Sequence, residues 1–340
     1  MQEPEEKINQ DEWLKDLPVQ TENIAFKPEE MILCEKCRRN NPPNRLKCFY
    51  CAADLKLSNE QAGLVKPVLR KLELWEKGFN LIIQPASTNF SELNTTEISK
   101  NIGFESGIVQ KIIEAGKSVP VARVETQNEA EVVRKILHRY GLETIIVADE
   151  VLASEKSLKR LRGIEFSDDK LILILFNQDE IFEISREDLA LIVSGAVFEK
   201  KTESIEKRKK GERKILDASE TASDEMLIDI YGRQDSTGFR ILSKGFDFSC
   251  LGAEKTMLAV ENMKRLAVKF QEFAPQAKTV DDYLSVREIL GNVWEIESRK
   301  DSFGLKRHSF GKFDFSNVSS SNNLQQFTKY SRLQWQLLNS

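Results

Sequence analysis

Four cysteines fall within eighteen residues of this 340-residue chain, and their spacing is the strongest chemical signal in the sequence. The order is Cys34-x2-Cys37-x10-Cys48-x2-Cys51. Each Cys-x2-Cys turn can direct two thiolates to one ion, and the loop between the turns is short enough for the two pairs to meet at tetrahedral geometry. The spacing predicts one structural Zn²⁺. A rubredoxin-type iron site uses the same ligands and remains an alternative.

The cysteine segment is too small to build a hydrophobic core of its own. We therefore expect the metal to supply the folding free energy, which is of order 10 kcal/mol in isolated zinc fingers. Four of the five cysteines lie in this cluster, and such a distribution is more typical of a metal site in a reducing compartment than of a disulfide framework. This favours a cytoplasmic protein.

Residues 31–55 resemble a known type of zinc finger. The four cysteines and Asn41 reproduce the C-x2-C-x3-N-x6-C-x2-C skeleton of the Ran-binding-protein type finger, and the segment is also similar to short zinc ribbons of many bacterial proteins. Ile32 replaces the tryptophan that precedes the first cysteine in that family, and Arg38-Arg39 replaces the Thr-Phe pair of its ubiquitin-binding members. These departures favour the bacterial ribbon. Arg38 and Ala52 each directly follow the second cysteine of a Cys-x2-Cys turn, a position where glycine is usual.

Basic and aromatic residues around the cysteines form a candidate contact surface for RNA or a protein partner. Its members are Arg38, Arg39, Asn41, Arg45, Phe49 and Tyr50. Residues 31–57 carry six basic and two acidic side chains, and four thiolates with one Zn²⁺ reduce their net charge of +4 to about +2. Arginines and aromatic rings of this kind bind single-stranded RNA by phosphate contact and stacking. The interpretation that we favour is that Phe49, Tyr50 and Leu55 cover the small core.

Composition excludes several classes of function. Fifty basic and 54 acidic residues give a formal charge of −4, which excludes a protein that coats DNA along its whole length. The apolar run at 171–176 is far shorter than the roughly 20 residues of a bilayer span, so we expect no integral membrane segment. Only His138 and His308 are available as imidazole bases, and no glycine-rich phosphate loop is present, so we expect no enzymatic activity.

The pattern of the whole chain predicts a multidomain α+β protein. Residues 1–30 hold nine acidic residues and three lysines, which predicts a disordered leader, and residues 295–340 are basic and rich in serine and asparagine, which predicts a disordered tail. The expected order is leader 1–30, zinc ribbon 31–57, linker helix 58–77, α+β sandwich 78–150, barrel-like domain 158–294 and tail 295–340.

The segment 78–150 alternates strand and helix patterns. Strands are predicted at 79–83, 119–125 and 143–149, and a Thr126-x-x-Glu129 capping box opens a helix that Gly141 closes. The order β-α-α-β-α-β predicts an open-faced sandwich. Over 78–149 it resembles the C-terminal domain of the bacterial ribosomal stalk protein. The lysine-bearing helix start of that protein is missing, so the resemblance implies the fold and not the binding function.

The segment 158–294 predicts seven short strands followed by an amphipathic helix. The strand patterns cover 162–167, 170–176, 180–185, 189–201, 225–231, 238–243 and 246–249. The helix at 254–273 carries its apolar residues at helical spacing, and a shorter helix is expected at 279–291. This order resembles pleckstrin-homology-like barrels over 161–275, which implies a seven-stranded barrel-like domain capped by the helix. The basic run at 200–214 is diluted by glutamates and favours a solvated loop, so peripheral contact with an anionic membrane is disfavoured.

Taken together, these features indicate a zinc-binding, non-enzymatic interaction or adaptor protein of bacterial type. We expect it to act through contacts with a protein partner. The alternative is an RNA- or ribosome-associated protein that uses the basic and aromatic residues of the zinc ribbon together with the basic tail.

Overall fold

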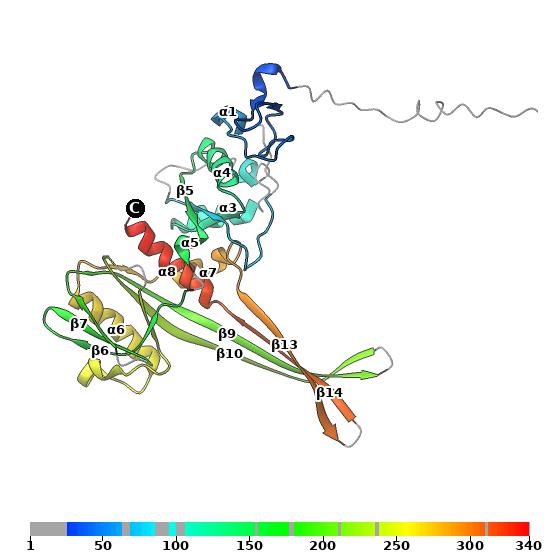
Figure 1. Ribbon diagram of the computed structural model, residues 1–340. Coiled ribbons are helices and arrows are strands. Elements are labelled where there is room, and N and C mark those ends of the chain that lie inside the picture. Colours follow the sequence, from blue (N-terminus) through cyan, green and yellow to red (C-terminus); the bar gives the residue numbers. More distant parts are fainter. Residues whose placement is uncertain are drawn as a thin grey trace, which may run out of the picture. The chain divides into compact units, whose positions relative to one another are not determined.

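The computed structural model describes residues 26–62, 69–85, 95–99, 106–153, 156–176, 180–209, 212–234, 238–309 and 312–339 (Figure 1). The chain divides into two compact units, Met1–Val65 and Lys66–Ser340. Most of the predicted acidic leader, residues 1–25, lies outside the described residues.

The first unit is a small ribbon with little buried apolar surface. Its elements are a 3-10 turn η1 (Pro28–Glu30), strands β1 (Ile32–Leu33) and β2 (Asn40–Asn41), which pair antiparallel, and helix α1 (Asn59–Ala62). Ile32, Leu55 and Leu57 are its buried aliphatic residues. The predicted linker helix at 58–77 is mostly wrong, because α1 is a single turn and the described residues 69–77 contain no helix.

The predicted β-α-α-β-α-β order is present at the start of the second unit. The elements are β3 (Phe79–Ile83), a helical turn at 95–99, α3 (Ser106–Ala115), β4 (Pro120–Val124), α4 (Gln127–Arg139) and β5 (Thr144–Ala148). The three strands form an antiparallel sheet in the order β4-β3-β5. The capping box is confirmed, because the Glu129 N–H donates to Thr126 Oγ1 at 3.2 Å. Gly141 has the left-handed backbone of a helix cap, with φ 78°.

The next part is an open curved sheet and not a barrel. It comprises α5 (Asp149–Leu152), β6 (Lys159–Phe166), β7 (Lys170–Leu175), β8 (Ile181–Ser185), β9 (Leu189–Lys209), β10 (Glu212–Gly232), β11 (Phe239–Leu242), η2 (Phe248–Glu254), α6 (Ala259–Phe273), β12 (Lys278–Val280) and α7 (Tyr283–Leu290). Two later strands, β13 (Glu297–Ser309) and β14 (Lys312–Asn322), complete the sheet. The strand order is β13-β14-β9-β10-β11-β6-β7-β8, with β12 beside β9. Among the described residues no strand pairs with the outer edge of β8, so the predicted seven-stranded barrel-like domain is not a closed barrel.

The core of this sheet lies against α6, as the sequence predicts. Met263, Leu266 and Phe270 of α6 are fully buried, together with apolar side chains from β6 to β11. The alternation in β7 directs Leu171 and Leu173 inward. Six of the seven predicted strands form. The seventh, at 246–249, leads into η2, because Asp247 accepts hydrogen bonds from Ser249 and starts a tight turn.

Two long hairpins extend through segments for which the sequence predicts a loop or a disordered tail. β9 and β10 run for 21 residues each, so the described residues of the basic run, 200–209 and 212–214, form a β-ribbon and not a loop. In the part of this ribbon nearest the sheet, Lys200 pairs with Glu220 at 2.7 Å. Part of the predicted disordered tail forms the second hairpin, β13 (Glu297–Ser309) and β14 (Lys312–Asn322), which extends beside the first (Figure 1).

The rest of the predicted tail is helix α8 (Leu324–Leu338), and it is a buried element. Phe327, Tyr330 and Leu333 follow helical spacing and are at most 1% exposed. A side chain at Gly195 of β9 would collide with the Phe327 ring, so this glycine makes room for the helix. The expectation of disorder over 295–340 is therefore wrong for the described residues of this segment, since a low aliphatic content is offset by aromatic packing.

Helix α8 and the loop before β13 join the sandwich to the curved sheet. The Trp294 Nε1–H donates to Asn80 Oδ1 at 2.8 Å, and the Arg332 guanidinium donates to the carbonyl oxygens of Leu152 and Lys156. The segments 78–150, 158–294 and 295–340, predicted as separate, thus form one compact unit. None of the described helices combines the length and apolarity that crossing a bilayer requires.

A buried ion pair lies at this junction. The Asp149 carboxylate accepts from the Asn80 side chain at 2.9 Å and from Arg123 Nη2 at 2.7 Å, and Lys329 Nζ is 3.9 Å away. Burial opposes ionisation of Asp149, but the hydrogen bonds and the two cations outweigh it and lower the pKa of this carboxyl. The paired charges hold β3, β4 and α8 together.

Candidate metal centre

The four predicted ligand sulfurs meet at one point in the ribbon. The Sγ atoms of Cys34 and Cys51 are 3.6 Å apart, those of Cys37 and Cys48 are 3.5 Å apart, and all four lie within 4.8 Å of one another. Four Zn–S bonds of 2.3 Å at tetrahedral angles place sulfurs about 3.8 Å apart. The cluster therefore has the size of a four-thiolate metal site, and the predicted juxtaposition of these cysteines is confirmed.

Two similar backbone turns position the sulfurs. In the first turn the Arg38 N–H donates to the Cys34 carbonyl at 2.9 Å, and in the second the Ala52 N–H donates to the Cys48 carbonyl at 2.9 Å. Arg38 and Ala52 have left-handed backbones, with φ of 59° and 56°. These are the two positions at which the sequence lacks the usual glycine, so both turns are held against the preference of an L-residue.

Replacing Ala52 with glycine should stabilise the metal-loaded ribbon by about 1 kcal/mol, because glycine adopts a positive φ without the Cβ clash. The measurement is the guanidinium concentration at which the full chain releases zinc to a colorimetric chelator. Ala53→Gly is the matched control, since Ala53 follows at a position without positive φ and should gain nothing. A lower release midpoint for Ala52→Gly would contradict the strain assigned to this turn.

Asn41 links the two turns and is not available to a partner. Its Nδ2–H donates to the Arg39 carbonyl at 2.9 Å, and its Oδ1 accepts from the Phe49 N–H at 2.8 Å. The side chain is fully buried. The prediction that Asn41 belongs to the contact surface is therefore wrong: a short amide that bridges two loops is satisfied internally.

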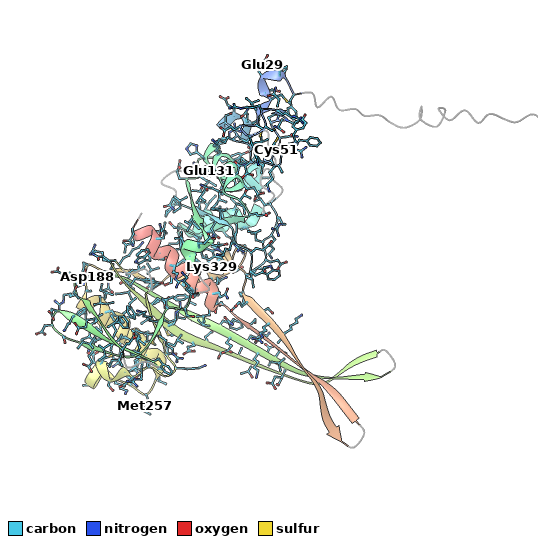
Figure 2. All side chains as sticks on the ribbon, viewed as in Figure 1. Glu29, Cys51, Glu131, Asp188, Met257 and Lys329 are labelled. Carbon is cyan, nitrogen blue, oxygen red and sulfur yellow. The ribbon has the colours of Figure 1, made fainter. Side chains whose placement is uncertain are left out.

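The remaining candidate residues form an exposed surface. The side chains of Phe49 and Tyr50 are 66% and 53% exposed, whereas Leu55 is buried. The expectation that both rings cover the core is therefore wrong, and only Leu55 does so. Arg45 lies over the Phe49 ring at 4.9 Å and Arg39 over the Tyr50 ring at 4.7 Å. We call Arg39, Arg45, Phe49 and Tyr50 the aromatic-arginine surface; Phe49 and Tyr50 belong to the turn that ends at Cys51, which is labelled in Figure 2.

The ring geometry gives this surface a defined shape. Phe49 and Tyr50 meet edge to face, with centroids 5.5 Å apart and an interplanar angle of 87°. Arg38, the other predicted contact residue, is exposed directly after Cys37. The sequence shows that aromatic and basic residues are present. The exposure of two adjacent rings depends on the direction of the Cys48–Cys51 turn, and the spacing of the cysteines is the only sequence signal for that turn.

The sulfur cluster favours unequal ionisation of its thiols. Burial opposes ionisation of Cys48, but the Tyr50 and Cys51 N–H groups overcome it and lower its pKa to about 6. At Cys37 the Arg39 N–H favours the thiolate, yet burial and the neighbouring sulfurs raise the pKa to about 12. Four thiolates this close repel one another, so their joint ionisation requires a cation between them.

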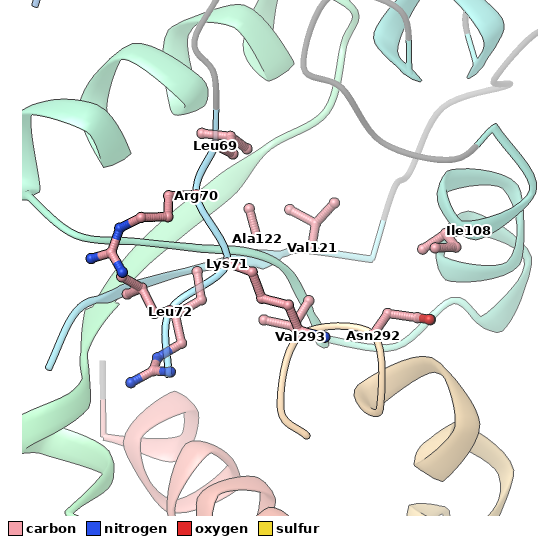
Figure 3. Close-up of a pocket in the computed structure, with 10 residues that line it drawn as sticks. Leu69, Arg70, Lys71, Leu72, Ile108, Val121, Ala122, Asn292 and Val293 are labelled. Atoms are coloured by element: carbon pink, nitrogen blue, oxygen red, sulfur yellow. The ribbon is translucent and has the colours of Figure 1, made fainter. Parts of the chain in front are cut away.

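A cavity of about 370 Å³ lies in the second unit (Figure 3). Its lining is Leu69, Arg70, Lys71, Leu72, Ile108, Val121, Ala122, Arg123, Asn292 and Val293. None of these side chains is a carboxylate, imidazole, thiol or hydroxyl. All three of its cations pair with carboxylates outside the lining, Arg70 with Glu76, Lys71 with Glu295 and Arg123 with Asp149. Its one amine, that of Lys71, is therefore held in an ion pair.

No protein-family model, no curated protein and no solved structure matches this chain. The resemblance of 31–55 to zinc ribbons therefore depends on the cysteine motif and on the gathered sulfurs. The resemblances of 78–149 and 161–275 depend on element order alone.

Proposed function

We propose that the chain is a zinc-binding, non-enzymatic adaptor protein whose ribbon presents the aromatic-arginine surface to a protein partner. The observation that carries this proposal is the exposure of Phe49 and Tyr50, 66% and 53%, on a turn that the metal ligands hold in place. Large exposed aromatic side chains are unfavourable in water, and adjacent ones indicate a contact site. Tyrosine and arginine are also the residue types enriched among the residues that dominate binding energy at protein interfaces.

The stacking of the arginines supports a prepared binding surface. A guanidinium over each ring restricts both side chains, so less conformational entropy is lost when a partner binds. Zinc would act structurally in this mechanism. It fixes the Cys48–Cys51 turn, and the turn orients the rings.

Single-stranded RNA is the second candidate partner, because arginines and exposed rings in one patch also suit phosphate contact and base stacking. The geometry favours protein over RNA for a specific reason. Each ring already has a guanidinium over one face, which leaves a base only the opposite face. The net charge of about +2 on the zinc-loaded ribbon also gives only a weak field.

The test compares the zinc-loaded full chain with Phe49→Ala/Tyr50→Ala in proximity labelling inside the native host, followed by titration of the identified partner. We expect the double variant to weaken that complex at least tenfold while keeping one zinc per chain. Leu33→Ala is the matched control, since Leu33 is 50% exposed on β1 of the same ribbon and should have little effect. Equal losses for both variants would contradict a specific role of the aromatic-arginine surface.

Titration with a single-stranded RNA oligonucleotide at low and high salt separates the two candidates. Binding that weakens steeply with salt and requires Phe49 and Tyr50 would replace the protein-partner proposal with the RNA alternative. Absence of RNA binding at low salt would remove that alternative.

A further inference from the structure

A short turn before β3 presents a tryptophan side chain to solvent. Trp75 lies in the turn 73–76 and is 80% exposed, more than any other aromatic residue that the structure describes. Single exposed apolar side chains are common on protein surfaces, so the surroundings of Trp75 decide whether it indicates a binding site. Two observations separate it from such a case: hydrogen bonds fix the turn, and Trp75 lines a cavity.

A network of hydrogen bonds fixes the turn that carries Trp75. The Glu76 N–H donates to the Glu73 carbonyl at 3.1 Å, and the Glu76 carboxylate accepts from the Glu73 N–H at 2.8 Å and from Arg70 at 2.8 and 2.9 Å. The Arg123 guanidinium donates to the carbonyl oxygens of both Glu73 and Glu76. The backbone that carries the indole is therefore in place before a ligand arrives, which lowers the entropy lost on binding.

The cavity beside Trp75 has a volume of about 400 Å³ and lies within the second unit. Its other walls are the start of α5, the first residue of β13 and part of α8. A volume of this size is within the range of small-ligand sites. The cavity differs in chemistry from the one in Figure 3, because four of its lining side chains are carboxylates, those of Glu76, Asp149, Glu150 and Glu297.

The buried cations that line this cavity already have partners. Arg123 donates to Asp149 at 2.7 Å as well as to the two carbonyl oxygens of the turn. The Lys329 side chain, labelled in Figure 2, is 8% exposed, and its Nζ lies 3.9 Å from the Asp149 carboxylate and 5.9 Å from the centre of the Trp294 ring. An anionic ligand would have to compete with Asp149 for both cations.

Two of the carboxylates keep acceptor sites for a ligand. The Glu297 carboxylate accepts from Gln325 Nε2 at 2.5 Å, and this donor is neutral. Glu150 lies 3.6 Å from Lys77 Nζ, and the two side chains are 58% and 65% exposed, so water screens this pair. A carboxylate has room for about four hydrogen bonds. The capacity that the cavity offers to a ligand is thus mainly that of charged acceptors, next to an exposed indole ring.

We propose that this cavity binds a guanidinium group. A guanidinium is a flat cation that stacks on an indole ring and donates two parallel hydrogen bonds to a carboxylate. The carboxylates would repel a phosphate, and a neutral base or sugar ring would cover Glu150 and Glu297 without supplying a counter-charge. An ammonium group has the charge but not the plane. A free metabolite such as L-arginine and an arginine side chain of a protein both supply the group.

The inference is independent of the zinc ribbon, because all of these residues belong to the second unit. The test titrates the zinc-loaded full chain with free L-arginine and with a blocked glycine-alanine-arginine-alanine-glycine peptide, followed by calorimetry and tryptophan fluorescence. We expect binding, and the same peptide with citrulline, a neutral group of nearly the same shape, should bind about tenfold more weakly. Tighter binding of the peptide would assign the guanidinium to a protein partner, and tighter binding of free L-arginine would assign it to a metabolite.

Substitutions in the cavity locate the binding. Trp75→Ala should weaken it by about fivefold through loss of the stacked ring, and Trp75→Phe should keep most of the affinity. Glu297→Gln should weaken it by about tenfold. Glu288→Gln is the matched control, because Glu288 is 86% exposed on α7 and does not line this cavity, and its affinity should stay within about twofold of the parent.

Equal binding of the arginine and citrulline peptides, an equal loss in Glu288→Gln, or binding of adenosine monophosphate in place of arginine would each overturn the proposal. Absence of binding to both arginine probes would overturn it as well. The comparison of arginine with citrulline uses the unsubstituted chain, so it decides the matter even if a variant fails to fold.

Discussion

Replacing Cys48 with serine should release the zinc and unfold the ribbon while the second unit stays folded. Cys48 is 3% exposed and belongs to the cluster of four sulfurs, so serine cannot take its place as a thiolate ligand. Because the metal supplies folding free energy of order 10 kcal/mol in such small domains, the effect is the largest that we expect from a single substitution. Native mass spectrometry reports the metal, and hydrogen exchange reports unfolding of residues 26–62.

Cys250→Ser is the matched control for this experiment. Cys250 is the remaining cysteine and lies outside the sulfur cluster, and burial raises the pKa of its thiol, which disfavours a thiolate there. This variant should keep one zinc per chain. Retention of zinc by Cys48→Ser, or iron in place of zinc in the purified chain, would contradict the assignment of a structural zinc site.

Replacing Asp229 with alanine should destabilise the second unit by about 3–5 kcal/mol. Asp229 on β10 lies directly opposite Arg240 on β11, and both oxygens of the carboxylate accept from the guanidinium at 2.7 Å. The two side chains are 0% and 8% exposed. Burial of Arg240 opposes its charge, but Asp229 outweighs this and raises the pKa of the guanidinium, so loss of the carboxylate leaves a charged group buried without its counterion. Urea unfolding followed by tryptophan fluorescence measures the change.

Two further variants separate the buried charge from the contact itself. Asp229→Leu/Arg240→Met removes both charges and should recover most of the lost stability, since apolar residues often replace buried pairs without loss. Glu183→Ala breaks the exposed pair with Lys170, whose side chains are 54% and 38% exposed, and should cost less than about 1 kcal/mol. Equal costs for Asp229→Ala and Glu183→Ala would show that the pair on β10 and β11 is not a buried charge pair.

Sequence patterns predicted the features whose determinants lie within a few residues. The Thr126-x-x-Glu129 capping box and Gly141 set the limits of α4, and the Cys-x2-Cys turns brought the four sulfurs together. The apolar spacing of α6 placed its buried face. In each case the residues that decide the structure are local, so no knowledge of distant contacts was needed.

The remaining features depend on residues that are far apart in sequence. Residues 200–209 and 212–214 resemble a loop because many of them are charged, yet they form strands because β9 pairs with β10 along a ribbon. The residues of α8 look polar, but Phe327 packs where Gly195 leaves space, and the Tyr231 and Ser331 hydroxyl groups are 2.8 Å apart. The barrel-like prediction for 158–294 missed the open sheet for the same reason, because local periodicity does not show which strands pair at the edges of a sheet.

The position of α8 has a consequence for how the chain folds during synthesis. Asn80, Leu152 and Gly195 leave the ribosome more than a hundred residues before their partners Trp294, Arg332 and Phe327. Until those partners are made, the nascent chain exposes an unpaired edge of β9 and the apolar surface around Gly195 against which α8 later packs. Such surfaces attract chaperones and neighbouring nascent chains, so the vulnerable interval in the life of this protein precedes its release.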